Sequence, residues 1–588
     1  MMPCCPNLMR LPSGPLTSRT RGHRAMRAST ALLSLFLLAS SGAAAPARSR
    51  ATTGRLPETT AGESIYREGV LSTGKPLRGE RPSAPAVQGA AAACTNCHRR
   101  SGLGELEGRA LVPPITAKYL YRPRSQNRPN VLENRALTMT EPGARVELLR
   151  QADRGAYTDA TLARAIREGL GPDGRALDFL MPRFRIDDAD MTSLIAYLKQ
   201  LSKRPSPGVG DGTLQFATIV TPDADPVKRR GMLEVLEHFF GKPNVFSGGN
   251  APPAQLSNRF TPGSHQWQLH IWELTGAPES WEVQLDERLR REPVFAVISG
   301  IGGRTWAPVH RFCERTGLPC LFPNVDLPVA AELDFYDVYL SKGVLIEAQL
   351  IAERLQRLRD AGGRAHPERQ RVVQIVRGGD IGEAAAAELR RALPSHAFEL
   401  VDRVLEPGSD ATRLQEALSA SGPGDALILW LRPGDLASLP TQPPAEAAVF
   451  VSGIMAGLER APLAGPWRAT AWMAYPFDLP ERRRARMAYP LGWMQFKQIP
   501  VVDERTQSDT YLACLATAET VSMMGEDLVR DHLVETLEMH LGTRLLNGYY
   551  PRVGLAAGQR FASKGGFLVR FAGPDRTRLV ADGDWSSP

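Results

Sequence analysis

The hydrophobic residues beyond residue 213 fall into short runs that are separated by longer amphipathic segments. Helical patterns such as Lys342–Leu358 and Glu383–Ala392 lie between several of these runs. Alternating strands and helices predict parallel sheets covered by helices, and residues 213–580 are long enough for two such lobes. The predicted strands are Leu214–Val220, Val294–Ser299, Pro319–Pro323, Val372–Arg377, Ala426–Leu431 and Ala448–Ser452.

The hydrophobic pattern before residue 202 is helical instead. Asp159–Glu168 is amphipathic, and Asp187–Leu201 places its apolar residues at helical spacing. Residues 202–212, with the sequence SKRPSPGVGDG, have the proline, glycine and serine content of a linker. The pattern therefore predicts a front domain over residues 55–201 and a two-lobed α/β domain over residues 213–580.

Residues 1–47 have the three regions of a signal peptide in order. Residues 19–27 carry four arginines before the apolar run Ala31–Leu38, and Ala45-Pro46-Ala47 offers a cleavage site, with Ala43–Ala45 competing. The residues before Met26 are unlike a normal n-region, so Met26 is an alternative start. The apolar run is shorter than the ~20 residues that span a bilayer. We therefore expect cleavage, export to the periplasm and no transmembrane segment in the mature chain.

The composition is that of an ordinary globular protein. The chain has 588 residues, 43% of them hydrophobic and 23% charged, and at ~150 residues per domain this length predicts three or four compact units. The net charge of +8 is modest and includes the arginines near the amino terminus. No basic stripe interleaved with aromatic residues is present, so we expect no nucleic-acid partner.

The most specific motif is Cys94-Thr95-Asn96-Cys97-His98, a C-x-x-C-H pentapeptide. In an exported protein, two thiols at this spacing attach one c-type haem covalently, and the adjacent imidazole ligates the iron. Half of a zinc site, a redox dithiol and a structural disulfide are the alternatives. A zinc site usually needs a second close pair of ligands, and a thioredoxin-type dithiol lies near a βαβ pattern. The sequence has neither of these signals.

A second iron ligand is expected shortly before the last helix of the front domain. Met181 stands there, next to Pro182 and after the turn at residues 169–175. A thioether opposite an imidazole raises the reduction potential, and six-coordinate iron favours electron transfer over oxygen chemistry. Met139 and Met191 are competing thioethers, and an ordinary core methionine is the commoner role for this residue type.

These features resemble a class I c-type cytochrome over residues 62–201. The resemblance implies a small all-α domain around one covalent haem c, with His98 and Met181 as axial ligands. It also implies that a backbone carbonyl near Pro113 or Pro114 accepts a hydrogen bond from His98. The features that carry it are a helix around Ser64–Gly69, the C-x-x-C-H motif, the Gly102/Gly104 turn, Met181-Pro182 and the closing helix with Tyr197.

The larger domain resembles a type I periplasmic substrate-binding protein of the amino-acid and amide group. The resemblance implies two α/β lobes joined by a hinge, with a ligand cleft between them. It rests on the opening strand Gln215–Val220, the segments Val294–Gly303 and Arg315–Pro319, the lobe-crossing stretch Tyr336–Gly343 and the helix Ser508–Met524 as a later crossing.

Ligand-binding residues are expected at the carboxyl ends of the parallel strands. Gly302, Gly303 and Thr305 lie in a turn whose backbone N–H groups, near a helix start, suit a carboxylate. Asn324 and Asp326, after the next strand, also face the predicted cleft. The turn has a single hydroxyl, whereas the amino-acid binders use several, which argues against an amino-acid ligand. A tight turn that only connects strand and helix is the alternative.

The other cysteines and the lack of catalytic motifs leave the expected two-domain organisation unchanged. Cys313 and Cys320 are able to pair in an oxidising compartment if they lie close enough, and Cys514 would then be a lone thiol. The sequence has no nucleophile elbow, paired-carboxylate signature or phosphate-binding lysine loop. A catalyst is therefore less favoured than a carrier or a binding protein.

The sequence predicts a periplasmic electron-transfer protein with one His/Met-ligated haem c, tethered to a small-molecule-binding module. The expected partners are a small-molecule ligand and redox partners such as a dehydrogenase or a terminal electron acceptor. The alternative is a solute-binding receptor for transport or sensing, in which the haem reports the redox state.

Overall fold

The computed structural model describes residues 58–588 except residues 83, 108–109, 125–153, 204, 242–264, 331–333, 362–368, 446 and 545–546. The predicted signal peptide and the competing ligand Met139 lie outside the described residues. Within the described part, no helix combines the length and the apolar composition that a membrane span requires.

Residues 58–201, called the front module below, are built around two packed helices. α1 lies against α7, and Tyr66 and Leu194 are buried in their shared core. A Cβ at Gly62 would lie 2.1 Å from the Ser193 carbonyl oxygen, so glycine permits this close approach. The helices are α1 (Glu58–Glu68), α2 (Thr95–His98), α3 (Ala117–Leu120), α6 (Asp159–Glu168) and α7 (Asp188–Gln200).

The front module also contains short strands, so the prediction of an all-α domain is wrong in this respect. β1 (Arg78–Arg81) pairs antiparallel with both β2 (Ala84–Gln88) and β5 (Arg183–Arg185), and β3 (Glu105–Glu107) pairs with β4 (Ala110–Val112). These strands are three to five residues long, and β1 and β2 are mostly exposed. They pair through backbone hydrogen bonds and lack an alternating apolar pattern, which removes the signal that predicts a strand.

Lobe 1 is a mostly parallel sheet covered by helices. Its main strand order is β11-β10-β9-β7, with β8 parallel to β7 and β6 antiparallel to it. The strands are β6 (Val209–Gly210), β7 (Thr213–Val220), β8 (Gln266–Glu273), β9 (Ala296–Ile298), β10 (Cys320–Leu321) and β11 (Asp337–Val338). The helices are α8 (Pro226–Phe240), α9 (Trp281–Arg291), α10 (Ala307–Thr316), α17 (Pro480–Phe496), α18 (Glu504–Met524) and α19 (Arg530–His540).

Lobe 2 has a seven-stranded sheet in the order β13-β12-β14-β15-β16-β17-β18. The first five strands are parallel, and the last two are antiparallel additions from the end of the chain. The strands are β12 (Gln370–Arg377), β13 (Phe398–Leu405), β14 (Ala426–Trp430), β15 (Ala448–Ser452), β16 (Trp472–Tyr475), β17 (Phe567–Ala572) and β18 (Arg578–Ala581). The helices are α11 (Val344–Ala361), α12 (Gly382–Ala392), α13 (Ala411–Leu418), α14 (Pro433–Leu436), α15 (Gly453–Ala456) and α16 (Gly465–Thr470).

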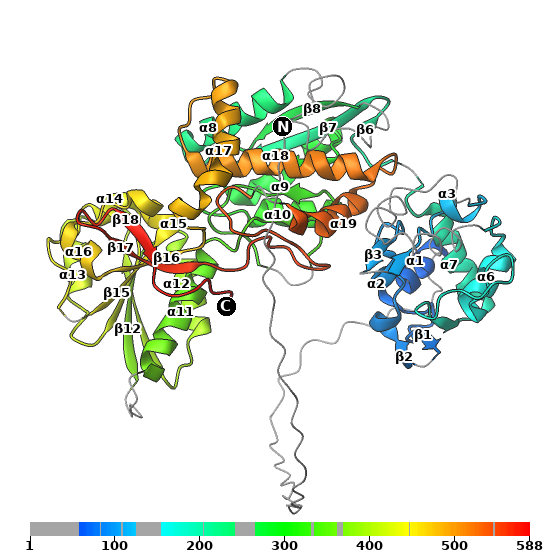
Figure 1. Ribbon diagram of the computed structural model, residues 1–588, viewed down its shortest axis with the longest axis horizontal. Helices are drawn as coiled ribbons and strands as arrows, with labels where there is room; N and C mark the ends of the chain where they lie inside the picture. The colour runs from blue at the N-terminus through cyan, green and yellow to red at the C-terminus, as the bar shows by residue number, and fades with distance from the viewer. Residues whose placement is uncertain are drawn as a thin grey trace, which may run out of the picture. The chain divides into compact units, whose positions relative to one another are not determined.

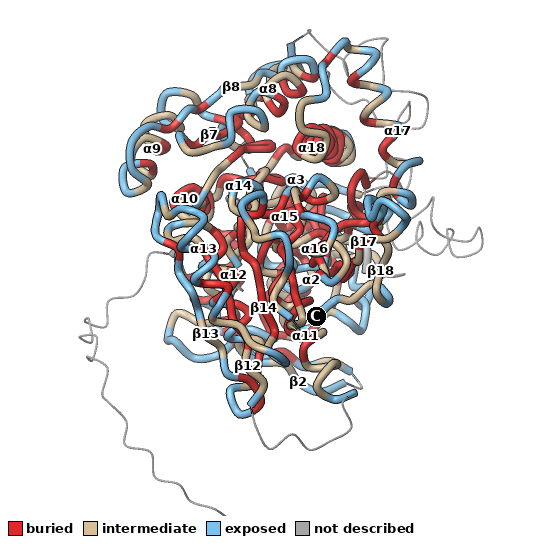
Figure 2. The backbone as a smooth tube through the Cα atoms, turned by 90° about the vertical axis from the view of Figure 1, so that its left-hand side faces the viewer, coloured by how far each residue is buried: buried red, intermediate tan, exposed pale blue. Residues whose placement is uncertain are grey.

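The two lobes confirm the predicted α/β architecture with parallel strands. Figure 1 shows α11 and α12 beside the lobe 2 sheet, and Figure 2 shows its inner strands β12 and β14 as buried. The apolar runs form strands because helices cover both sheets and remove the runs from water.

The chain passes between the lobes three times: after β11, after β16 and before β17. The helix Ser508–Met524, predicted to be a crossing, is part of α18 and packs against α8 and β9 of lobe 1 instead. Most residues of α18 are buried, so the helix belongs to the core of lobe 1 (Figure 2).

Candidate functional site

The C-x-x-C-H motif forms one helical turn. Cys94 is the N-cap of α2, and Cys97 and His98 lie within the helix. Residues three apart on a helix project from the same side, so both thiols face one direction. Both cysteines are partly exposed, whereas His98 is buried. The turn therefore presents two thiols beside a buried imidazole.

The structure confirms the expected backbone partner of His98. The ring nitrogen Nδ1 lies 3.0 Å from the carbonyl oxygen of Pro113. Burial lowers the pKa of His98 to about 4, although the hydrogen bond to Pro113 acts in the opposite direction. The imidazole is therefore neutral at pH 7, and with Nδ1–H donating to Pro113 the other ring nitrogen is in the form that binds a metal.

Met181, the predicted second iron ligand, is the remaining member of the expected donor set. Met181 is half-buried against the core of the front module, on the segment before β5. Gly104 donates its N–H to the His98 carbonyl at 3.2 Å, and a Cβ there would lie 2.1 Å from the Val112 carbonyl oxygen. Two thiols, a neutral imidazole and a thioether are the groups that a covalently attached haem c requires. The haem itself stays a prediction.

The residues that follow His98 are bound to α19 of lobe 1. Arg99 pairs with Glu538, which also pairs with Arg560. Ser101 donates to Glu535 from its backbone N–H at 3.1 Å and from its hydroxyl at 2.5 Å. All five of these residues are buried. The segment that follows the C-x-x-C-H motif and lobe 1 therefore share a buried polar network.

A pocket lies between lobe 1 and lobe 2. Asn324 and Asp326 line it after β10, Arg505 and Asp509 line it from α18, and Ile454 lines it from lobe 2. Its volume is about 20 Å³, which suits one or two water molecules. A larger solute therefore requires the lobes to move apart. The other lining residues are Pro323, Val325, Tyr339, Leu340, Ser341, Gly343 and Tyr550.

Asp326 is the anion at the centre of the charged groups in this pocket. Its carboxylate lies 2.7 Å from Arg505 Nη2 and 3.4 Å from Lys228 Nζ. Burial by itself would raise the pKa of Asp326, but Lys228 and Arg505 hold it well below its usual range. Two cations therefore face one permanently ionised carboxylate.

Asp509 has the opposite electrostatic character. Its Oδ2 accepts a hydrogen bond from the Tyr550 hydroxyl at 3.3 Å, and its buried Oδ1 has no hydrogen-bond partner among the described residues. Burial raises the pKa of Asp509 to about 7, although Arg505 and Tyr550 favour the ionised form. Because buried acceptors are normally satisfied, Oδ1 is a place where a solute would donate a hydrogen bond.

We expect the native chain to lose stability as the pH rises from about 4 to about 7, because Asp509 must ionise in a buried site. The variant Asp509→Asn should not show this loss. An acid whose pKa is raised by folding binds more protons folded than unfolded, so its contribution to stability falls as the pH rises through this window. A rise to about 7 corresponds to about 4 kcal/mol at most. Urea unfolding at both ends of the window measures the difference, and equal pH slopes for variant and native chain would contradict the assignment.

The glycine-rich turn after β9 binds a carboxylate of the protein itself. The backbone N–H of Arg304 donates to Asp223 Oδ2 at 2.8 Å, and a Cβ at Gly303 would lie 2.4 Å from the Asp223 carbonyl oxygen. The Thr305 hydroxyl accepts from the Ala307 N–H at 3.2 Å, at the start of α10. Gly302, Gly303 and Thr305 are not among the residues that line the pocket, whereas Asn324 and Asp326 are.

Sequence reasoning missed Lys228, Arg505 and Asp509. These residues come from α8 and α18, whereas the search was confined to the ends of strands. One feature of the sequence pointed to these residues: Arg505 and Asp509 are opposite charges four residues apart, so they lie on the same side of a helix. Charged residues at that spacing are also common on exposed helices, so only the fold distinguishes them.

In comparisons with known proteins, the chain is similar only to solved structures. No model of a protein family matches the chain, and no curated protein matches it. A fatty acid ABC transporter substrate-binding protein from Thermomonospora curvata has 15% identity and a TM-score of 0.47, over 66% of this chain and 95% of its own. A branched chain amino acid ABC transporter from Thermus thermophilus with bound valine has 12% identity and a TM-score of 0.47, over 64% and 97%.

A possible leucine/isoleucine/valine-binding protein from Rhodopirellula baltica SH 1 is similar at 14% identity and a TM-score of 0.44, over 63% of this chain and 97% of its own. None of these comparisons bears on the haem prediction. What the two lobes bind therefore has to be inferred from the residues that line their pocket.

Proposed function

We propose that the chain is an exported solute-binding protein whose two lobes close around one small polar solute. The observation that best supports this proposal is the pocket between the lobes, where charged side chains of α18 meet the ends of the lobe 1 strands. Hinge closure around a ligand is a common motion of two-lobed proteins. The resemblance of residues 213–580 to substrate-binding proteins implies that the protein delivers the solute to a permease of the ABC type.

The chemistry of the pocket defines the class of solute. Arg505 offers donors to an acceptor group, and Asp509 Oδ1 offers an acceptor to a donor group. A compact molecule that carries both kinds of group satisfies both sides of the pocket. An apolar molecule would exclude water from the pocket and leave the Asp509 acceptor unsatisfied, at a cost of about 1–3 kcal/mol.

A thermal-shift panel on the full chain tests this proposal. Amino acids, hydroxy acids, amines and short diols are added separately, and we expect one polar class to raise the melting temperature by selective binding to the folded state. In Ile454→Trp a larger side chain fills the pocket from lobe 2, so the same compounds should have no effect. No shift with any class, or equal shifts in Ile454→Trp, would contradict the proposal.

We further propose that the front module carries one covalent haem c, which gives this receptor a redox-responsive group. The proposal is supported by the two thiols of the α2 turn and by the fixed, neutral imidazole of His98. The buried network from Arg99 to Glu538 joins this turn to the lobe that carries most of the pocket. Electron transfer as the main role is the second candidate, and it depends on the same haem.

We expect Cys94→Ser/Cys97→Ser to abolish covalent haem attachment, because serine cannot form the thioether links. The native chain, produced in a host that matures c-type cytochromes, should keep its colour after denaturation and extraction with acidified acetone. Cys514→Ser removes a buried thiol elsewhere and should also keep the colour. A native chain whose colour leaves with the solvent would exclude covalent attachment.

A further inference from the structure

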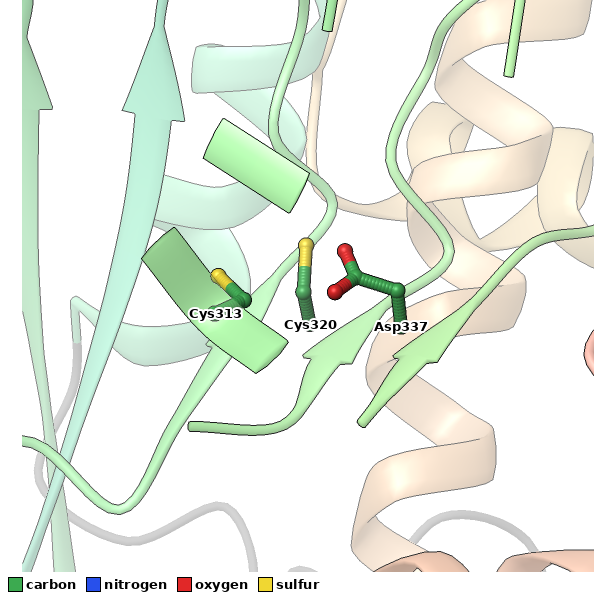
Figure 3. Close-up of side chains that lie close together, drawn as sticks. All are labelled: Cys313, Cys320 and Asp337. Atoms are coloured by element: carbon green, nitrogen blue, oxygen red, sulfur yellow. The ribbon is translucent and has the colours of Figure 1, made fainter. Parts of the chain in front are cut away.

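Three side chains with metal-binding groups meet inside lobe 1, away from the pocket. Cys313 lies on α10, and Cys320 and Asp337 are directly paired residues of the neighbouring strands β10 and β11. Figure 3 shows the Asp337 carboxylate turned toward Cys320. The two sulfur atoms and a carboxylate oxygen all lie within 4.8 Å of one another.

Asp337 is buried without the partners that a buried carboxylate normally has. Its exposed fraction is 0%, and apart from the Cys320 thiol beside it no donor of the described residues bonds to either side-chain oxygen. An ionised carboxylate in such surroundings is very unfavourable unless a cation neutralises it.

His310 is the nearest nitrogen ligand to this carboxylate. Its Nδ1 lies 3.6 Å from Asp337 Oδ1 and 2.8 Å from the Tyr339 hydroxyl, and its Nε2 lies 2.6 Å from Asp334. Glu314 is engaged elsewhere, because its carboxylate accepts the backbone N–H groups of residues 335–337. Two thiols, one carboxylate and one imidazole are therefore the groups available at this place.

We propose that Cys313, Cys320 and Asp337 bind one thiophilic divalent cation of the zinc type, which leaves a fourth position for a water molecule or for His310, whose Nδ1 lies 3.6 Å from Asp337 Oδ1. Zinc prefers four ligands drawn from cysteine, histidine and aspartate, arranged as a tetrahedron. With metal–ligand bonds of about 2.0–2.3 Å, neighbouring ligand atoms in such a tetrahedron are about 3.5 Å apart. The three ligand atoms lie within 4.8 Å of one another, so they would move closer together on binding the ion.

A disulfide between Cys313 and Cys320 is the competing outcome in an oxidising compartment. The disulfide would consume both thiols but would leave Asp337 buried with no cation and no donor. The metal uses all three groups at once and removes the unfavourable burial of the carboxylate. The arrangement of Asp337 is therefore the reason to prefer the cation.

The proposed metal site would hold in place a loop that lines the pocket. A bound cation would tie α10 to β10 and β11, and the loop after β10 carries Asn324 and Asp326. Because the three ligands are fully buried, the metal would enter while the chain folds and would stay with it. The proposal does not depend on which solute the pocket accepts.

Metal analysis and zinc-edge X-ray absorption on the full chain test the proposal. We expect one zinc per chain, with two sulfur neighbours at about 2.3 Å and two nitrogen or oxygen neighbours at about 2.0 Å. Iron from a haem does not interfere, because the zinc edge reports zinc alone. Absence of zinc, or zinc without sulfur neighbours, would overturn the proposal even if every variant failed to fold.

Variants locate the ion. Cys320→Ser and Asp337→Asn should lose the bound zinc, whereas Cys514→Ser, which changes a buried thiol on α18, should keep one zinc per chain. Alkylation of the denatured native chain without reductant should modify both Cys313 and Cys320. A peptide pair linked through these residues would show a disulfide instead and would reject the metal site.

Discussion

Glu538→Ala is expected to lower the free energy of unfolding by about 3–5 kcal/mol, because it removes one partner from a buried charge network. The Glu538 side chain is 3% exposed and pairs with both Arg99 and Arg560, whose side chains are 9% and 4% exposed. Without the carboxylate, two guanidinium groups lose their shared anion inside the protein. Urea unfolding of the full chain measures the loss.

Glu526→Ala is the matched control for this prediction. Glu526 also faces the front module, with its carboxylate 3.7 Å from Lys118 Nζ, but its side chain is 80% exposed. Exposed ion pairs contribute little, so this variant should unfold within about 1 kcal/mol of the native chain. Similar losses in the two variants would mean that burial of the network does not decide its energy.

Arg505→Met should weaken solute binding by about thirtyfold or more, with the polar class found by the thermal-shift panel as the probe. Arg505 lines the pocket and provides the closer of the two cations around Asp326. Methionine keeps much of the side-chain volume but removes every donor, which leaves Lys228 as the remaining ion-pair partner of Asp326. Isothermal titration measures the affinity.

Arg413→Met provides the comparison, because Arg413 is an exposed cation of lobe 2 that pairs with Glu416. Its solute affinity should equal that of the native chain. If Arg505→Met bound as tightly as Arg413→Met, the charged pocket would not be the binding site.

The inner strands β7, β12, β14 and β15 were predictable because they are apolar on both faces, whereas the edge strands β8 and β13, which carry exposed polar residues, were missed. β7, β12, β14 and β15 lie within about two residues of their predicted ranges. Helices cover both faces of these strands, so no polar alternation is needed and the runs are continuous. β1 and β2 of the front module lacked this signal because their polar residues are exposed.

The candidate sites were predictable where a short motif carries them. The contact between His98 and Pro113 follows from residues close together in the chain. The charge cluster in the pocket joins Lys228, Asp326 and Arg505, which are far apart in sequence, so only the packing of α8 and α18 against lobe 1 reveals it. The glycine-rich turn was expected to suit the carboxylate of a ligand, and in the structure the backbone N–H of Arg304 in this turn donates to Asp223 of the same chain.

Mass spectrometry of the solute released from the purified chain tests the central claim most directly. The full chain is isolated from the periplasm under native conditions and then denatured, and the small molecules set free are identified and counted. We predict one polar compound per chain from the native protein and none from Ile454→Trp. Release of no compound, or of the same amount from the filled-pocket variant, would contradict closure of the two lobes on a solute.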